Sequence, residues 1–204
     1  MITIIIIIIT VIVSMICFGN SRVSENLNFN PFRIFKKNEY YRFISHAFVH
    51  ADWVHLLVNM FVFFSFGNYV ENSFANFESE NIIVNSKLSF LILYFGGIAI
   101  ASIKSFIKHR NHSWYRSVGA SGAVSAVLFT SIFLSPMEKI YFYGILPVPG
   151  IVFGILYLVY SSYMNKKSQD NINHDAHFWG AVYGFIFPLL LDFELLNNFL
   201  NSLF

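Results

Sequence analysis

Residues 45–61 read SHAFVHADWVHLLVNMF, a stretch in which an apolar helix begins among hydrogen-bonding side chains. His55 and Asn59 fall inside the apolar run, whereas His46 and His50 precede it. Polar side chains inside a membrane-spanning helix are costly and usually have a function. Two questions follow: whether the chain lies in a bilayer, and what these polar groups do there.

The composition favours a membrane protein. Of the 204 residues, 56% are hydrophobic and 12% are charged, and the mean hydropathy is +0.58. A soluble domain carries about twice that charged fraction, so a bilayer is the expected solvent. The net charge of +2 does not suggest a nucleic-acid partner. Cys17 is the only cysteine, which excludes an intramolecular disulfide.

Six apolar stretches predict six transmembrane helices, because a helix needs about 20 mostly apolar residues to cross the bilayer. The first stretch lacks a basic leading region and is longer than the apolar part of a signal peptide, so it is interpreted as a retained helix. Pro147 and Pro149 place the start of the fifth stretch at the membrane interface. The prediction is a multi-pass, all-α bundle in one domain, residues 1–204, with helices at about 2–19, 53–70, 88–107, 121–135, 150–164 and 176–191.

The polar residues within these stretches are expected at one side of the bundle. His55 and Asn59 lie near the start of the second helix, and Ser121 begins the fourth. His177 lies near the start of the sixth. Even-numbered helices of a six-helix topology enter the membrane from the same side, so these groups should face one leaflet. The fourth helix covers only ~20 Å of a ~30 Å hydrocarbon core, which places Ser121 up to ~10 Å inside the bilayer.

Small residues predict close packing of the fourth and sixth helices. Gly119 and Gly122 flank the serine, and Gly180 and Gly184 form a GxxxG face on the sixth helix. Such faces let membrane helices approach closely. His177 lies one turn before Gly180 on that face, so it is expected beside the fourth helix.

These features predict a Ser121–His177 dyad, with the serine as nucleophile and the histidine as general base and acid. A helix N-terminus offers unpaired N–H groups and the positive end of the dipole, which suit an oxyanion. His55 and Asn59, four residues apart on one helical face, are expected to donate hydrogen bonds to that oxyanion.

The ordered motifs resemble those of the rhomboid family of intramembrane serine proteases. The matching motifs are His46-x3-His50-x4-His55-x3-Asn59, Gly119-Ala120-Ser121-Gly122 and Ala176-His177-x2-Gly180-x3-Gly184. Tyr41-Arg42 stands where the family usually carries Trp-Arg, and Glu71 matches an acidic position of the family at the end of the second helix. The resemblance extends over nearly the whole chain, including the long first loop.

The resemblance implies a serine endopeptidase that cleaves single-pass transmembrane proteins within the bilayer, without a metal or other cofactor. Ser121 and His177 would be catalytic, and His55, Asn59 and the Ser121 backbone N–H would form the oxyanion hole. The supporting residues would be Gly119, Gly122, Gly180, Gly184, Tyr41, Arg42, His46, His50 and Glu71.

One departure concerns Ser125. Many family members carry an aromatic residue four positions after the serine, where it stacks under the catalytic histidine. A hydrogen bond from the Ser125 hydroxyl to His177 is one way to replace that contact. A loss of turnover in Ser125→Ala is expected in that case.

Several alternatives stay open at this point. His46 and His50 are four residues apart and could bind a metal with His55 and His177, although HExxH is absent. A catalytically silent relative that binds transmembrane helices would share the fold. Asp175 is interpreted as a helix N-cap rather than a third triad member.

The side of the membrane that the site faces is also open. Of the 13 Lys and Arg residues, all but Lys87 and Lys139 lie on the side of the site. The positive-inside rule places that side in the cytoplasm, whereas the family usually opens away from it.

Overall fold

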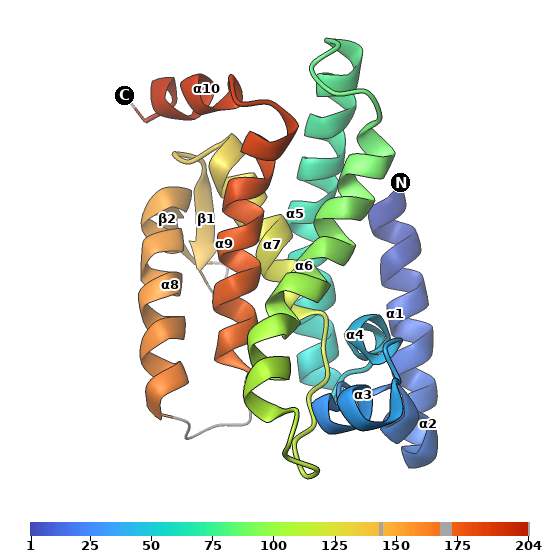
Figure 1. The fold of residues 1–204 in the computed structure, drawn as a ribbon. Helices are drawn as coiled ribbons and strands as arrows, with labels where there is room; N and C mark the ends of the chain where they lie inside the picture. Colours follow the sequence, from blue (N-terminus) through green and yellow to red (C-terminus); the bar gives the residue numbers. More distant parts are fainter. Residues whose placement is uncertain (143–144, 168–172, 204) are drawn as a thin grey trace.

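The computed structural model describes residues 1–142, 145–167 and 173–203, which form a helical bundle around one central helix (Figure 1). The long helices are α1 (Ile2–Gly19), α5 (Trp53–Ser79), α6 (Ser86–His109), α7 (Ser121–Leu134), α8 (Gly150–Lys167) and α9 (His174–Leu191). Every residue of α7 from Gly122 to Phe133 is buried. A helix that is apolar on all sides needs such an interior position. α1 and α8 stand at opposite edges of the bundle.

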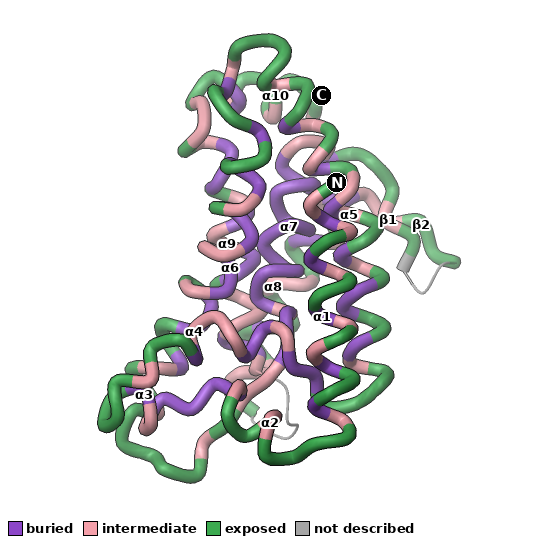
Figure 2. The backbone as a smooth tube through the Cα atoms, turned by 90° about the vertical axis from the view of Figure 1, so that its right-hand side faces the viewer, coloured by how far each residue is buried: buried purple, intermediate pink, exposed green. Residues whose placement is uncertain are grey.

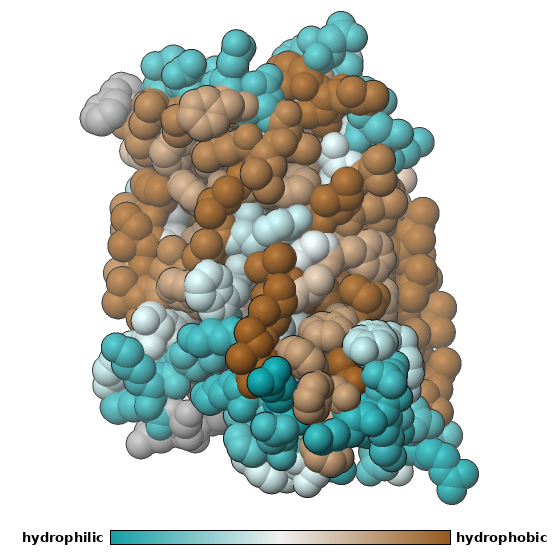
Figure 3. Space-filling view, in the orientation of Figure 1, coloured by the Kyte–Doolittle hydropathy of each residue, from teal (hydrophilic) through white to brown (hydrophobic). Residues whose placement is uncertain are grey.

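The described helices identify the chain as an integral membrane protein. By length and composition, α1, α5 and α6 can each cross a bilayer, and α9 with α10 (Leu195–Asn201) makes a fourth span if this pair, bent by 118°, is counted as one. α7 is a shorter apolar helix. The face in Figure 3 carries a broad hydrophobic band between two hydrophilic ends. Exposed side chains such as Ile8, Phe61 and Val159 fit contact with lipid.

Burial decreases from the centre of the bundle to its edge. Figure 2 shows buried residues along the inner helices, whereas α1 alternates between exposed and buried residues. The inward side of α1 carries Thr3, Thr10 and Ser14, each fully buried. Thr10 donates a hydrogen bond to the carbonyl of Ile6, so its hydroxyl is satisfied within the helix.

The connection between α1 and α5 is folded. It contains α2 (Ser21–Leu27), α3 (Pro31–Lys37), α4 (Arg42–Ser45) and the short 3₁₀ helix η1 (His46–Phe48). Asn20 and Asn30 cap α2 and α3 with their side-chain oxygens, and Pro31 occupies the first turn of α3, where its missing N–H costs nothing. The segment packs beneath the bundle at the end where α5, α7 and α9 begin (Figure 1).

The structure corrects several helix bounds and adds a hairpin. α5 ends at Ser79 rather than at residue 70, because Val70 and Phe74 still pack into the core beyond the apolar run. β1 (Lys139–Phe142) and β2 (Leu146–Pro149) pair antiparallel before α8. Pro147 and Pro149 fit there, because a strand with only one neighbour has N–H groups that need no partner in the ladder. The order of the long helices is otherwise as the sequence predicts.

Candidate active site

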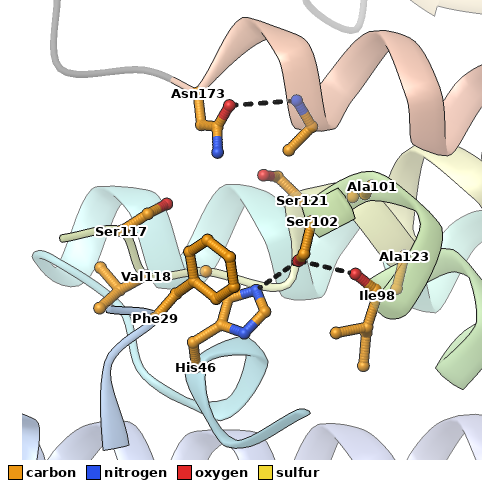
Figure 4. A pocket seen from close by; sticks show the side chains of 13 residues that line it. Phe29, His46, Ile98, Ala101, Ser102, Ser117, Val118, Ser121, Ala123 and Asn173 are labelled. Atoms are coloured by element: carbon orange, nitrogen blue, oxygen red, sulfur yellow. Dashed lines mark hydrogen bonds between the residues drawn. The ribbon is translucent and has the colours of Figure 1, made fainter. Parts of the chain in front are cut away.

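Ser121 is the first residue of α7 and lies within the bundle. Figure 1 shows the chain rising from the end of α6 into the bundle before α7 begins. The side chain is half-buried and lines a cavity of about 20 Å³, enough for a single water molecule. Ser102 and Asn173 line the same cavity, and Figure 4 shows the Ser121 side chain on the side that faces Asn173. The serine therefore lies beside a polar space at the N-terminus of a short helix.

Two backbone contacts fix the approach to Ser121. Phe29 and Ser117 form an antiparallel bridge with N–H···O distances of 2.9 and 3.0 Å. The N–H of Gly119 then donates to the carbonyl of His46 at 3.0 Å. Gly119 has a φ of +118°, which side-chain-bearing residues rarely adopt. The first connection thereby holds the glycine turn that starts α7.

Gly180 and Gly184 allow α7 and α9 to touch through their backbones. A Cβ atom on Gly180 would overlap the carbonyl oxygen of Gly122, and one on Gly184 would overlap that of Ala126. Thr130 adds a 2.7 Å hydrogen bond to the carbonyl of Gly184. Glycine is needed at both positions because backbone atoms occupy the space of a side chain.

His177 lies in the first turns of α9, at the same end of this contact as Ser121. Ser121 directly precedes Gly122, and His177 lies one turn before Gly180, so both residues flank the Gly122–Gly180 contact of the two helices. The His177 ring faces Tyr157 of α8, with centroids 6.2 Å apart and planes at 18°. His174 lies edge-on at 5.9 Å. One ring from α8 and one from α9 thus lie beside the predicted base.

His55 and Asn59 lie on the α5 face that turns toward Gly119. A Cβ atom on Gly119 would lie 2.7–2.8 Å from two atoms of the His55 ring, so the imidazole packs directly against the glycine backbone. Asp52 caps α5 by accepting from the N–H of His55 at 2.8 Å. Asn59 is buried, and its Nδ2 donates to the carbonyl of His55 at 2.8 Å. An amide nitrogen carries two hydrogens, so one donor of Asn59 is left for another acceptor.

His46 and His50 brace the first connection. The Nδ1 of His46 lies 2.9 Å from the carbonyl of Arg42, and its Nε2 lies 3.5 Å from Ser102 Oγ. His50 Nδ1 lies 2.9 Å from Ser14 Oγ of α1. Burial lowers the pKa of His46 to about 4. Burial, with repulsion from His55, lowers the pKa of His50 to about 3. Both rings are therefore neutral near pH 7.

Arg42 and Glu71 join distant segments of the chain. The fully buried Arg42 guanidinium donates to Glu39 at 2.5 Å and to the carbonyls of Glu25 and Asn28 at 2.9 and 2.8 Å. Glu71 lies at the other end of the bundle, where it accepts from the first N–H groups of α1 at 2.6 and 3.0 Å. Each residue thus holds together segments that are far apart in the sequence.

The interpretation of Asp175 as a helix cap is wrong. α9 begins at His174, and Asn173 is its cap, accepting from the N–H of Ala176 at 3.1 Å. Asp175 therefore lies inside the first turn. It accepts from Asn165 of α8 at 2.8 Å and pairs with Lys104 of α6 at 2.7 Å, which ties three helices together.

Sequence reasoning missed Tyr157, Asn173, Ser102 and Phe29. A tyrosine in an apolar helix gives no signal of which neighbour it faces, and a single serine is a common packing residue.

Among the residues that the structure describes, no group of three or more His, Cys, Asp or Glu side chains could hold a metal ion.

Comparison with known proteins identifies the family of the chain. The Rhomboid domain model matches residues 37–192, which is most of the chain. The chain belongs to the rhomboid family. It is 29% identical over 154 residues to RHOMBOID-like protein 12, mitochondrial, of Arabidopsis thaliana, with 72% of this chain and 45% of the relative covered. Rhomboid-like protein 11, chloroplastic, of the same plant is 28% identical over 165 residues, covering 75% of this chain and 53% of the relative. The chain thus spans about half the length of these curated relatives.

Proposed function

We propose that the protein is an intramembrane serine endopeptidase that uses a Ser121–His177 dyad. The observation that carries the proposal is the pairing of a serine at the N-terminus of α7 with a histidine at the same end of the close α7–α9 contact. A structural helix-packing role needs the glycines of that contact but neither side chain. Family membership adds weight, because rhomboid proteins are in general intramembrane serine proteases.

The chemistry requires a neutral His177. Its imidazole takes the proton of Ser121 Oγ while the oxygen attacks the scissile carbonyl carbon. The tetrahedral intermediate then collapses, the C–N bond breaks, and the imidazolium returns its proton to the leaving amine. Water repeats the sequence on the acyl-enzyme: the histidine takes a proton from water, and the serine leaves with that proton. No oxidant, reductant or metal enters the balance.

The oxyanion would form between α5 and the start of α7. The N–H groups at the beginning of α7 have no partner within the helix and are available as donors. His55 packs against Gly119, two residues before Ser121, and Asn59 has a second amide hydrogen. Removal of one such donor typically slows turnover about 100- to 1,000-fold.

The substrate would be a single-pass transmembrane protein. A peptide bond in a helix is shielded by its own hydrogen bonds, so the substrate helix must unwind locally to reach Ser121. The cavity behind Ser121 holds room for one water molecule, and water is the second reactant of hydrolysis. Helix-weakening residues and a small side chain beside the scissile bond should help.

The test is cleavage of a transmembrane substrate by the purified protein in liposomes. Wild type should release two fragments, and Ser121→Ala and His177→Ala should release none while their melting temperatures stay within a few degrees. EDTA should leave the rate unchanged. Cleavage by Ser121→Ala, or binding of transmembrane peptides without any cleavage by wild type, would favour the silent helix-binding alternative. Loss of activity in EDTA would restore the metal alternative.

A further inference from the structure

Tyr157 of α8 lies parallel to the His177 ring. Their centroids are 6.2 Å apart and the planes make an angle of 18°. Offset-stacked aromatic pairs are found at centroid separations of about 4.5–7 Å, so this geometry is that of an attractive pair. The two residues belong to neighbouring helices, so the contact is a tertiary one between α8 and α9.

Tyr157 is itself held in place by α7. Its hydroxyl lies 2.7 Å from Ser125 Oγ, within hydrogen-bond distance. The ring packs on Phe129 at 5.5 Å and on Phe153 at 6.1 Å. Ser125 and Phe129 are four residues apart and share one face of α7. The tyrosine ring is thus fixed at its hydroxyl and along its sides.

Ser125 makes room for this arrangement. It is 3% exposed, and its small side chain ends at the Tyr157 hydroxyl. A large aromatic residue at position 125 would need the space that the tyrosine occupies, because the interior is closely packed. There is therefore no room for aromatic side chains at position 125 and at position 157 at the same time. The Ser125 hydroxyl lies within hydrogen-bond distance of the Tyr157 hydroxyl, so Ser125 reaches His177 indirectly, through the tyrosine ring.

We infer that Tyr157 is a positioning residue that holds the His177 ring, and that Ser125 anchors it. The expected effect on catalysis rests on the proposed function. The stacking of the two rings is independent of that function. In many family members the aromatic ring that stacks on the catalytic histidine belongs to the residue four positions after the serine, on α7. In this chain the ring beside His177 is that of Tyr157, on α8. A change at either Ser125 or Tyr157 should move the base without touching the nucleophile.

The experiment measures the rate of Ser121 labelling by a fluorophosphonate in detergent-solubilised protein. Tyr157→Leu keeps apolar bulk but removes the ring and hydroxyl, and labelling should fall roughly 10- to 100-fold, as for a misplaced catalytic group. Tyr157→Phe keeps the ring and should lose only a few-fold. Tyr163→Ala, an exposed tyrosine on the same helix, is the matched control and should label like wild type. Ser125→Phe combined with Tyr157→Leu returns an aromatic ring to α7 and should recover much of the rate.

A second readout does not depend on activity. With ¹³C-labelled histidine, the His177 ring resonance should shift in Tyr157→Leu, because the ring current of the tyrosine is lost, and should stay in place in Tyr157→Phe and Tyr163→Ala. An unshifted His177 resonance together with unchanged labelling in Tyr157→Leu would overturn the inference and leave the proposed function standing. Failure of wild type to label would overturn the proposed function instead, and the resonance alone would then decide whether Tyr157 holds the histidine.

Discussion

Gly180 of α9 lies against the carbonyl oxygen of Gly122 of α7, and no side chain fits between them. This contact sets the separation of the two helices that carry Ser121 and His177. Because backbone rather than a flexible side chain occupies the space, a bulkier residue at position 180 must move a helix.

Gly180→Ala should therefore separate the candidate dyad. Overpacking of this kind costs about 1–3 kcal/mol of stability, and a displacement near 1 Å can slow catalysis about 100-fold. Thermal unfolding and substrate cleavage in liposomes measure the two effects. The control is Gly154→Ala on α8, whose Cβ would meet Ile132 and Phe129 at an ordinary 3.4 Å. Equal behaviour of the two variants would show that the α7–α9 separation is not critical.

Gly119→Ala should disturb the start of α7 in two ways. The φ of +118° strains any residue with a Cβ, by about 1–3 kcal/mol, and the new methyl group would collide with the His55 ring. Adding His55→Ala should relieve the collision and recover part of the melting temperature. Cleavage should stay low, because a candidate oxyanion donor has been removed. Strictly additive losses of stability in the double variant would contradict the packing of His55 on Gly119.

Arg42→Gln should loosen the first connection. The buried guanidinium has acceptors in residues 25, 28 and 39, and loss of one partner of a buried ion pair costs about 3 kcal/mol or more. Arg33→Gln is the matched control, because it pairs with the same Glu39 but is 31% exposed, and should cost less than about 1 kcal/mol. Unfolding in mixed detergent micelles measures both losses. Indistinguishable losses would mean that the buried contacts of Arg42 contribute little.

Acid should destabilise the protein through His46 and His50. Burial lowers the pKa of both rings, to about 4 and about 3, below that of an unfolded histidine. The unfolded chain therefore binds protons that the folded chain does not, so stability is complete above about pH 6.5 and falls as the pH drops toward these values. For each of the two histidines, the free energy of unfolding should fall by about 1.4 kcal/mol per pH unit in that window. Melting temperatures between pH 7 and pH 5 test this, and His50→Gln should reduce the slope. A melting temperature that rises on acidification would contradict the assignment of neutral rings.

The sequence predicts the order of the helices and the level of the candidate residues well. Apolar length marks α1, α5 and α6 as membrane spans, and the parity of six crossings predicts that His55, Ser121 and His177 lie at one end. The family match confirms the resemblance to the rhomboid family and the fold class, and the membrane location follows from the helices. The roles of the individual site residues stay predictions until activity is measured.

The contacts between helices are harder to predict, because a sequence does not give the rotation of one helix about its axis relative to another. α8 carries Tyr157, Tyr160 and Tyr163, and only the packed structure distinguishes the one that reaches Ser125. Helix ends are uncertain for a similar reason: α5 continues past its apolar run because tertiary packing at Phe74 outweighs the polar residues around it. The prediction for Asp175 is wrong because α9 begins at His174, where Asn173 supplies the cap.

The most direct measurement is mass spectrometry of the purified protein after reaction with a fluorophosphonate. A nucleophilic serine activated by a neighbouring histidine should carry the phosphonyl group on the peptide that contains Ser121, and the modification should disappear in His177→Ala at neutral pH. An unmodified Ser121 in folded wild-type protein, or an equal degree of modification in His177→Ala, would contradict the claim that these two residues act together.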